Sequence, residues 1–244
     1  MTRRAPATRA RPGDTPRAPA GRIVVPTEQG DAHVLIDRPV SPGRPRFLLA
    51  LTHGAGGGVE SADLLAARDA AVAADGVVAR ILQPYRVRGA RAPGSAARQD
   101  AAWVRVMEAL RETALGGPGG GAVPLIQGGR SNGARVACRT AGQAGARAVI
   151  ALAFPLHPPG HPEKSRRDEL RCATAAGADV LVVNGSRDPF GVPGPADAGG
   201  PGSARIVVLE GETHQLSKDP AAVGAAVSSW FSGWVHDRGV FAGR

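Results

Sequence analysis

Ser131 stands in a setting that suits a nucleophile attacking a carbonyl carbon. Residues 129–133 read Gly129-Arg130-Ser131-Asn132-Gly133 and fit the pattern Gly-x-Ser-x-Gly. An apolar run precedes this motif and a helical pattern follows it directly. Ser131 is therefore expected on a sharp strand-to-helix turn, where small neighbours leave room for a strained backbone. The helix N-terminus there would favour developing negative charge. The alternative is a glycine-rich turn that only caps a helix.

A serine hydroxyl needs a base to become nucleophilic, and the base must be oriented by a carboxylate. Where serine occupies such a turn, the acid and then the histidine are expected to follow it along the chain. Asp188 follows the apolar run 179–184, and His214 follows the next run, 205–210. Both would lie at the C-terminal ends of strands, the edge where open α/β sheets bind ligands. We predict Asp188 as the acid and His214 as the base.

Other carboxylates and histidines compete for these roles. Asp197 lies in a Gly/Pro-rich linker, and Asp219 is expected to cap the last helix. The competing histidines, which lie in an early strand, a proline-rich loop or near the chain end, are His33, His157, His161 and His236. The spacing of His157 and His161 would suit a metal on a helix, but the surrounding prolines exclude a helix, so no metal site is predicted. Only His214 lies directly after the eighth predicted strand, beyond the acid, whereas His236 lies near the end of the last helix.

A reaction of this kind forms an oxyanion that two backbone N–H groups must bind. One donor is expected from Asn132, the residue after the nucleophile, and the other from the loop after the third strand. That loop reads His53-Gly54-Ala55-Gly56-Gly57-Gly58. Ala55 is the predicted second donor, with Gly54 or Gly56 as alternatives. A phosphate-binding loop is disfavoured, because neither Gly-Lys-Ser/Thr nor the spacing Gly-x-Gly-x-x-Gly is present. The chemistry requires no cofactor.

Eight apolar runs are candidate strands, and the central ones are apolar throughout, as in a parallel sheet covered on both faces. They span residues 22–26, 33–37, 47–52, 77–83, 123–127, 148–154, 179–184 and 205–210. Helical patterns span residues 62–74, 96–115 and 131–142, a short stretch at 163–172, and a last helix that opens at Asp219-Pro220. The pattern predicts an α/β fold whose mostly parallel, eight-stranded sheet has an antiparallel start and helices on both faces.

The charge of the chain is concentrated at its start. The formal net charge is +9, and residues 1–22 contribute six arginines and one aspartate to it. Residues 1–20 contain no large apolar residue after Met1, so a disordered tail is predicted, followed by one domain over residues 21–244. The arginine usage resembles a GC-rich coding bias, so no specific nucleic-acid partner is predicted.

The remaining composition favours a protein of the cytoplasm. Only two cysteines occur, Cys138 and Cys172, so a disulfide framework is not expected. No apolar run approaches the roughly 20 residues that cross a bilayer, so no membrane association is predicted. Arg3-Arg4 is not followed by the apolar segment of a twin-arginine signal.

The motifs, taken in order over residues 21–235, resemble the α/β-hydrolase superfamily. Three pieces are similar to compact dienelactone-hydrolase-like proteins of the testis-expressed protein 30 and KAT8-regulatory-complex subunit 3 group. They read Leu51-Thr52-His53-Gly54-Ala55-Gly56, Gly128-Gly129-Arg130-Ser131 and Phe154-Pro155-Leu156-His157-Pro158-Pro159-Gly160. The resemblance implies the α/β-hydrolase fold and a Ser-His-Asp triad. It implies no substrate, and Asn132 stands where an apolar residue is expected in that group. Dienelactone hydrolases are expected to use a cysteine nucleophile, so Ser131 argues against that strict activity.

The expected reaction is acyl transfer to water on a small-molecule substrate. Only about 25 residues separate the sixth and seventh strands, which leaves no room for a large lid. We therefore expect an open site, with residues 155–162 as one wall, that accepts small or exposed esters. A non-catalytic binding or scaffold protein that retains the fold is the alternative.

Overall fold

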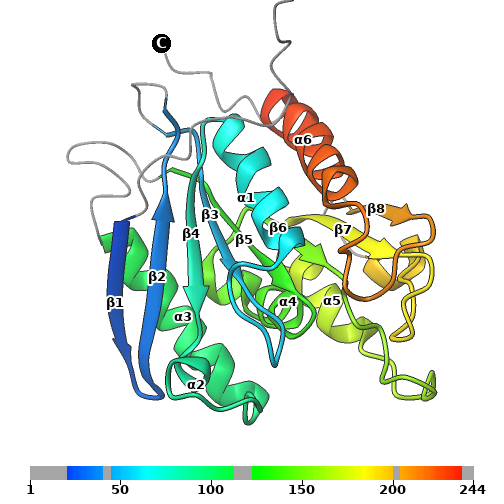
Figure 1. The fold of residues 1–244 in the computed structure, drawn as a ribbon, viewed down its shortest axis with the longest axis horizontal. Helices are drawn as coiled ribbons and strands as arrows, with labels where there is room; N and C mark the ends of the chain where they lie inside the picture. The colour runs from blue at the N-terminus through cyan, green and yellow to red at the C-terminus, as the bar shows by residue number, and fades with distance from the viewer. Residues whose placement is uncertain (1–20, 41–44, 113–122, 200–203, 238–244) are drawn as a thin grey trace, which may run out of the picture.

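A mixed sheet of eight strands runs through the molecule in the order β1-β2-β4-β3-β5-β6-β7-β8 (Figure 1). This computed structural model describes residues 21–40, 45–112, 123–199 and 204–237. The strands are β1 (Gly21–Thr27), β2 (Gly30–Asp37), β3 (Leu48–Thr52), β4 (Val77–Leu82), β5 (Leu125–Arg130), β6 (Ala148–Leu152), β7 (Asp179–Gly185) and β8 (Ala204–Leu209). Strand β2 pairs antiparallel with β1 and β4, and every other pairing is parallel.

Helices cover both faces of this sheet (Figure 1). On one face α1 (Ala62–Ala73) packs against α6 (Pro220–Asp237). On the other face α4 (Asn132–Ala144) packs between α3 (Ala96–Glu112) and α5 (Arg167–Ala175). Two single turns, α2 (Pro84–Val87) and the 3-10 helix η1 (Pro195–Ala198), complete the described elements. No helix in the described part of the chain is long and apolar enough to cross a membrane.

The predicted α/β architecture is confirmed, including the antiparallel start and the absence of a large lid over the described residues. Some boundaries were wrong. The fifth strand begins at Leu125 and continues to Arg130, so Gly128 and Gly129 are strand residues and not a turn. The short helix begins at Arg167 and not at residue 163. The turns α2 and η1 were not predicted, because four residues carry no helical periodicity. The predicted N-terminal tail and the end of the predicted helix 96–115 lie outside the described residues.

The apolar faces predicted for the two longest helices are buried. On α3, Trp103, Val106, Met107 and Leu110 are all nearly inaccessible to solvent. On α6, Trp230, Phe231 and Trp234 pack under the opposite face of the sheet, and the ring of Phe231 stacks on Phe47 with centroids 4.7 Å apart. The sheet is thus clamped between two apolar layers, which fixes the positions of its strand ends.

A buried glutamine ties β5 to the helices behind it. The side chain of Gln127 accepts a hydrogen bond from Trp103 Nε1 at 2.8 Å and donates to the Ala137 carbonyl at 2.7 Å. A buried amide requires such partners, because an unpaired one costs about 1–3 kcal/mol. The strand that leads to Ser131 is therefore fixed to both α3 and α4.

A buried ion cluster holds the antiparallel side of the sheet to α1. Asp37, at the end of β2, accepts hydrogen bonds from Arg80 Nε on β4 at 2.7 Å and from Arg68 Nη1 on α1 at 3.1 Å. Arg80 also donates to the Val59 carbonyl at 3.3 Å, which anchors the loop after β3. All three charged side chains are buried. Removal of one charge from such a cluster leaves the others uncompensated.

We predict that Asp37→Asn lowers the free energy of unfolding by about 3 kcal/mol, because the guanidinium groups of Arg68 and Arg80 lose the buried carboxylate that they share. Asp69→Asn is the matched control: Asp69 pairs with the same Arg68 at 2.6 Å but is 68% exposed, so its loss should cost under about 1 kcal/mol. Denaturant unfolding of both variants measures the difference. Equal losses would contradict this account of the cluster.

Candidate active site

Ser131 is the single residue that joins β5 to α4, and its backbone is strained. It has φ 52° and ψ −114°, a conformation that L-residues rarely adopt. The flanking glycines are required by close packing. A Cβ on Gly129 would lie 2.6 Å from the Thr52 carbonyl oxygen, and one on Gly133 would lie 2.8 Å from the His53 carbonyl oxygen. The Gly-x-Ser-x-Gly spacing thus lets the turn sit directly against the end of β3.

The structure brings Ser131, His214 and Asp188 together in one hydrogen-bonded chain. His214 Nε2 lies 2.9 Å from Ser131 Oγ, and His214 Nδ1 lies 2.8 Å from Asp188 Oδ2. The His214 side chain is 12% exposed and the Asp188 side chain is fully buried. These are the distances required of a nucleophile, a base and an orienting carboxylate.

The acid and the base are each held by further contacts. Asp188 Oδ1 accepts a hydrogen bond from the Phe190 backbone N–H at 2.9 Å, and Oδ2 accepts one from Asn184 Nδ2 at 3.3 Å. The Phe190 ring packs on the His214 imidazole, with centroids 4.2 Å apart and planes inclined by 34°. The carboxylate is therefore fixed on both oxygens, and one face of the imidazole is shielded from water.

The backbone around the two predicted oxyanion donors, Asn132 and Ala55, is fixed by the fold. The Asn132 N–H belongs to the first turn of α4, where no preceding helical carbonyl can accept it. The Gly54 carbonyl accepts hydrogen bonds from His53 Nδ1 at 2.8 Å and from the Gly57 N–H at 3.0 Å. In a trans peptide the Ala55 N–H points away from that carbonyl. The orientation of the Gly54–Ala55 peptide is thus fixed by two bonds on its far side.

His53 is held as one neutral tautomer. Its Nδ1 faces a carbonyl acceptor, and its Nε2 accepts a hydrogen bond from the Gln83 N–H at 3.0 Å, so the proton is on Nδ1. Burial lowers the pKa of His53 to about 4, opposed in part by the bond to Gly54. At neutral pH the side chain orients the loop as a dipole and adds no charge to it.

Arg130 connects the segments that carry the site. Its Nη2 donates to the His214 carbonyl and to Gln215 Oε1, both at 2.8 Å. Its Nε meets Asp63 Oδ2 at 3.0 Å, as an ion pair without hydrogen-bond alignment. Asp63 is fully buried near the start of α1; burial raises its pKa and the charge of Arg130 opposes that rise. One guanidinium therefore spans the nucleophile turn, the histidine loop and α1.

The competing carboxylates and histidines have other partners. Asp197 Oδ2 accepts a hydrogen bond from the Gly194 N–H at 2.9 Å, and Asp219 caps α6 by a 3.0 Å bond from the Ala222 N–H. Three of the remaining histidines bond other groups: His33 bonds Arg22, His157 bonds the Pro158 carbonyl, and His161 pairs with Glu163. His236 belongs to the last turn of α6. Cys138 is buried, which raises the pKa of its thiol.

No role in the site was predicted from the sequence for Arg130, Phe190 or His53. Arg130 lies within the Gly-x-Ser-x-Gly motif, and His53 begins the glycine-rich loop 53–58. Their roles depend on contacts between segments far apart in the chain. The one available signal was position: Arg130 adjoins the nucleophile, and Phe190 follows the acid by two residues.

The pKa of His53 gives a stability prediction. Between pH 6.5 and about 4, His53 is protonated in the unfolded chain but stays neutral in the folded protein. The free energy of unfolding should therefore fall as the pH falls through this range. The loss amounts to roughly 3 kcal/mol at about 1.4 kcal/mol per pKa unit. It should be absent from His53→Asn, which keeps a donor near Nδ1 but cannot titrate. Denaturant unfolding from pH 4 to 8 measures it; parallel curves for the two proteins would refute the assignment.

Comparison with known proteins identifies the family of the chain. Residues 45–224 match the family model of the alpha/beta hydrolase domain. No curated protein matches the chain in sequence.

Among solved structures, Est1E from Butyrivibrio proteoclasticus aligns with a TM-score of 0.68 at 15% identity, over 88% of this chain and 99% of that one. XC6422 from Xanthomonas campestris, described as an a/b serine hydrolase without lid, aligns with a TM-score of 0.65 at 17% identity, over 90% and 98%. Dienelactone hydrolase from Anabaena variabilis aligns with a TM-score of 0.66 at 16% identity, over 90% and 98%. These identities show a shared fold. With the family model matching well over half of its length, the chain belongs to the alpha/beta hydrolase domain family.

Proposed function

We propose that this protein is a serine hydrolase that cleaves a small or exposed ester, or a related acyl compound, through an acyl-enzyme intermediate. The observation that carries the proposal is the His214 imidazole, whose two nitrogens lie within 2.9 Å of Ser131 Oγ and Asp188 Oδ2. A purely structural histidine has no need of a strained serine on one side and a buried carboxylate on the other.

The reaction follows from these positions. As Ser131 Oγ attacks the carbonyl carbon, His214 Nε2 takes its proton, and Asp188 stabilises the imidazolium through Nδ1. The N–H groups of Asn132 and Ala55 bind the oxygen that becomes negative. His214 then returns the proton to the leaving alcohol. In the second half, His214 deprotonates a water that attacks the acyl-serine, and Ser131 is released with its proton.

The surroundings of the triad favour a compact substrate. The chain between β6 and β7 holds only α5 and a loop, and in that loop the His157 N–H donates to the Phe190 carbonyl at 2.9 Å. This contact supports the loop as a wall beside the ring that covers His214. No lid lies over Ser131 in the described residues, so an exposed ester has access.

Other features of the proposal rest on sequence. We place the protein nearest the testis-expressed protein 30 and KAT8-regulatory-complex subunit 3 group, because of its Pro-Leu-His-Pro-Pro-Gly piece. We propose a cytoplasmic location, an N-terminal tail over residues 1–20, one catalytic domain over residues 21–244, and a small-molecule acyl substrate without a nucleic-acid partner.

Labelling with a fluorophosphonate probe tests the activated serine. We expect one adduct on Ser131, located by mass spectrometry, that disappears in Ser131→Ala and falls by at least about a thousandfold in rate in His214→Ala, because the base is lost. His33→Ala is the matched control, since His33 lies on β2 and bonds Arg22 of β1, outside the proposed site. Failure of the folded wild type to react would favour a non-catalytic binding protein.

Arg130 is proposed as a positioning residue for His214. Arg130→Met removes the bond to the His214 carbonyl, and we expect kcat to fall about tenfold to a hundredfold while KM changes little, because a charge-assisted hydrogen bond contributes about 1.5–3 kcal/mol. Ester hydrolysis, normalised to probe-reactive serine, measures the effect. Arg135→Met is the control, since Arg135 pairs with Glu169 on the outer side of α4. A change confined to KM, or equal losses in both variants, would contradict the role.

A further inference from the structure

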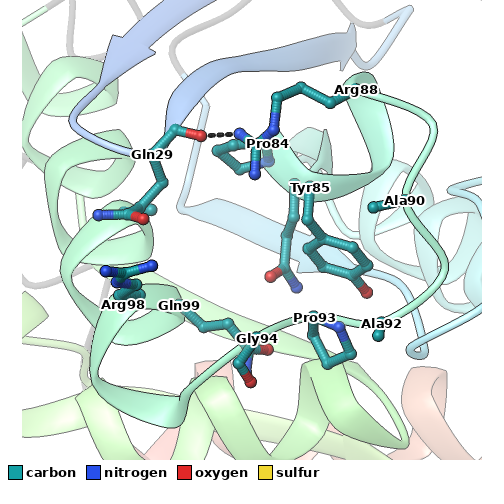
Figure 2. Close-up of a pocket in the computed structure, with 12 residues that line it drawn as sticks. Gln29, Pro84, Tyr85, Arg88, Ala90, Ala92, Pro93, Gly94, Arg98 and Gln99 are labelled. Carbon is teal, nitrogen blue, oxygen red and sulfur yellow. Dashed lines mark hydrogen bonds between the residues drawn. The ribbon is translucent and has the colours of Figure 1, made fainter.

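A small pocket lies between α2 and the first turn of α3 (Figure 2). Its volume is about 120 Å³, well below the roughly 300–1,000 Å³ of pockets that enclose drug-sized ligands. Figure 2 shows Arg98 and Gln99 on the α3 side, Pro84 and Tyr85 on the α2 side, and Gln29 from the β1–β2 turn. The pocket thus fits a short chain of a few atoms.

Two side chains in the wall of this pocket bond the residues predicted as oxyanion donors, through atoms other than their backbone N–H groups. Gln99 Oε1 accepts a hydrogen bond from Asn132 Nδ2 at 2.7 Å. Tyr85 Oη donates to the Ala55 carbonyl at 2.8 Å. Gln99 and Tyr85 thus line the pocket and also bond the two residues predicted to hold the substrate carbonyl, so the pocket adjoins the predicted oxyanion hole. A chain attached to that carbonyl carbon is the part of a substrate that would lie nearest to this pocket.

The electrostatics of the pocket favour an anion. Arg88 and Arg98 line it, and none of the described lining residues is acidic. Arg88 is held against the wall by donating to the Gln29 carbonyl (Figure 2). The pocket also borders the N-terminus of the 17-residue helix α3, whose first turn contains no acidic residue. Two guanidinium groups and a helix N-terminus thus converge on one small space.

We propose that this pocket binds a carboxylate at the far end of a short acyl chain, so that the substrate is a monoester of a small dicarboxylic acid. The inference rests on the proposed function, since it uses the oxyanion hole to fix the other end of the chain. Apolar atoms of Ala90, Ala92 and Pro93 face the hollow and suit the methylene groups between the two ends. The guanidinium groups of Arg88 and Arg98 bind the carboxylate by charge-assisted hydrogen bonds.

Paired substrates test the proposal. The anionic one is the mono-para-nitrophenyl ester of glutaric acid and the neutral one is para-nitrophenyl hexanoate, which has a similar length. We measure kcat/KM for each, with spontaneous hydrolysis subtracted, and take the anionic-to-neutral ratio. Arg98→Gln and Arg88→Gln should each lower this ratio about tenfold, because a charged hydrogen bond at an exposed rim lies at the low end of its range.

Arg91→Gln is the matched control. Arg91 lies exposed in the same loop but does not line the pocket, so its loss removes one positive charge and should leave the ratio unchanged. Equal ratios in wild type, Arg98→Gln and Arg88→Gln would overturn the proposal, and so would an equal fall in Arg91→Gln, which would indicate general attraction.

A direct binding measurement separates this inference from the proposed function. Glutarate binding is followed by calorimetry on the Ser131→Ala protein, which needs no catalysis. Binding that Arg98→Gln weakens about tenfold supports the pocket even if no ester is hydrolysed. Absence of binding, together with hydrolysis of neutral esters, overturns the pocket and leaves the hydrolase proposal standing.

Discussion

The close contact between the Ser131 turn and the end of β3 is the constraint on which the rest of the site depends. Gly129 and Gly133 have no side chains, so the turn can press against the carbonyls of Thr52 and His53. A strained residue of this kind costs about 1–3 kcal/mol and persists only where its surroundings hold it. Here the Ser131 N–H donates to the Leu152 carbonyl at 2.9 Å, and two parallel pairings fix β5 on either side. The hydrogen bonds at the centre of the sheet therefore hold Ser131 in its strained conformation.

The same contact positions the loop of residues 53–58, which contains the predicted oxyanion donor Ala55. The loop leaves β3 at Thr52, directly against the nucleophile turn, and a Cβ on Gly54 would lie 3.4 Å from the Cβ of Ser131. The loop is then anchored outward, by His53 to Gln83, by Tyr85 to the Ala55 carbonyl, and by Arg86 to the Gly57 carbonyl at 2.9 Å. Donors fixed before the reaction need no reorganisation when charge develops, which is the condition for strong electrostatic stabilisation.

The sequence predicted most of this arrangement because the relevant signals are local or ordered along the chain. Every apolar run became a strand, and the order of Ser131, Asp188 and His214 placed all three at one sheet edge. The missed features depend on tertiary contacts. Gly128 and Gly129 have low strand propensity, yet parallel pairing with β3 and β6 draws them into β5. Arginine is usually a surface residue, so nothing in the sequence indicated that Arg130 lies beside a buried carboxylate. The fold brings Arg130 to Asp63 and to the His214 carbonyl.

Two basic side chains near Ser131, His53 and Arg130, differ in charge for a physical reason. His53 is neutralised by burial, so it orients the oxyanion loop through hydrogen bonds alone. Arg130 cannot lose its proton in a protein, so its charge requires Asp63 as a buried counter-ion. An oxyanion formed in the proposed reaction would therefore meet backbone dipoles beside an arginine whose charge is already paired. The proposed carboxylate contacts would come from a different pair of cations, Arg88 and Arg98, which line the neighbouring pocket and have no part in orienting the loop.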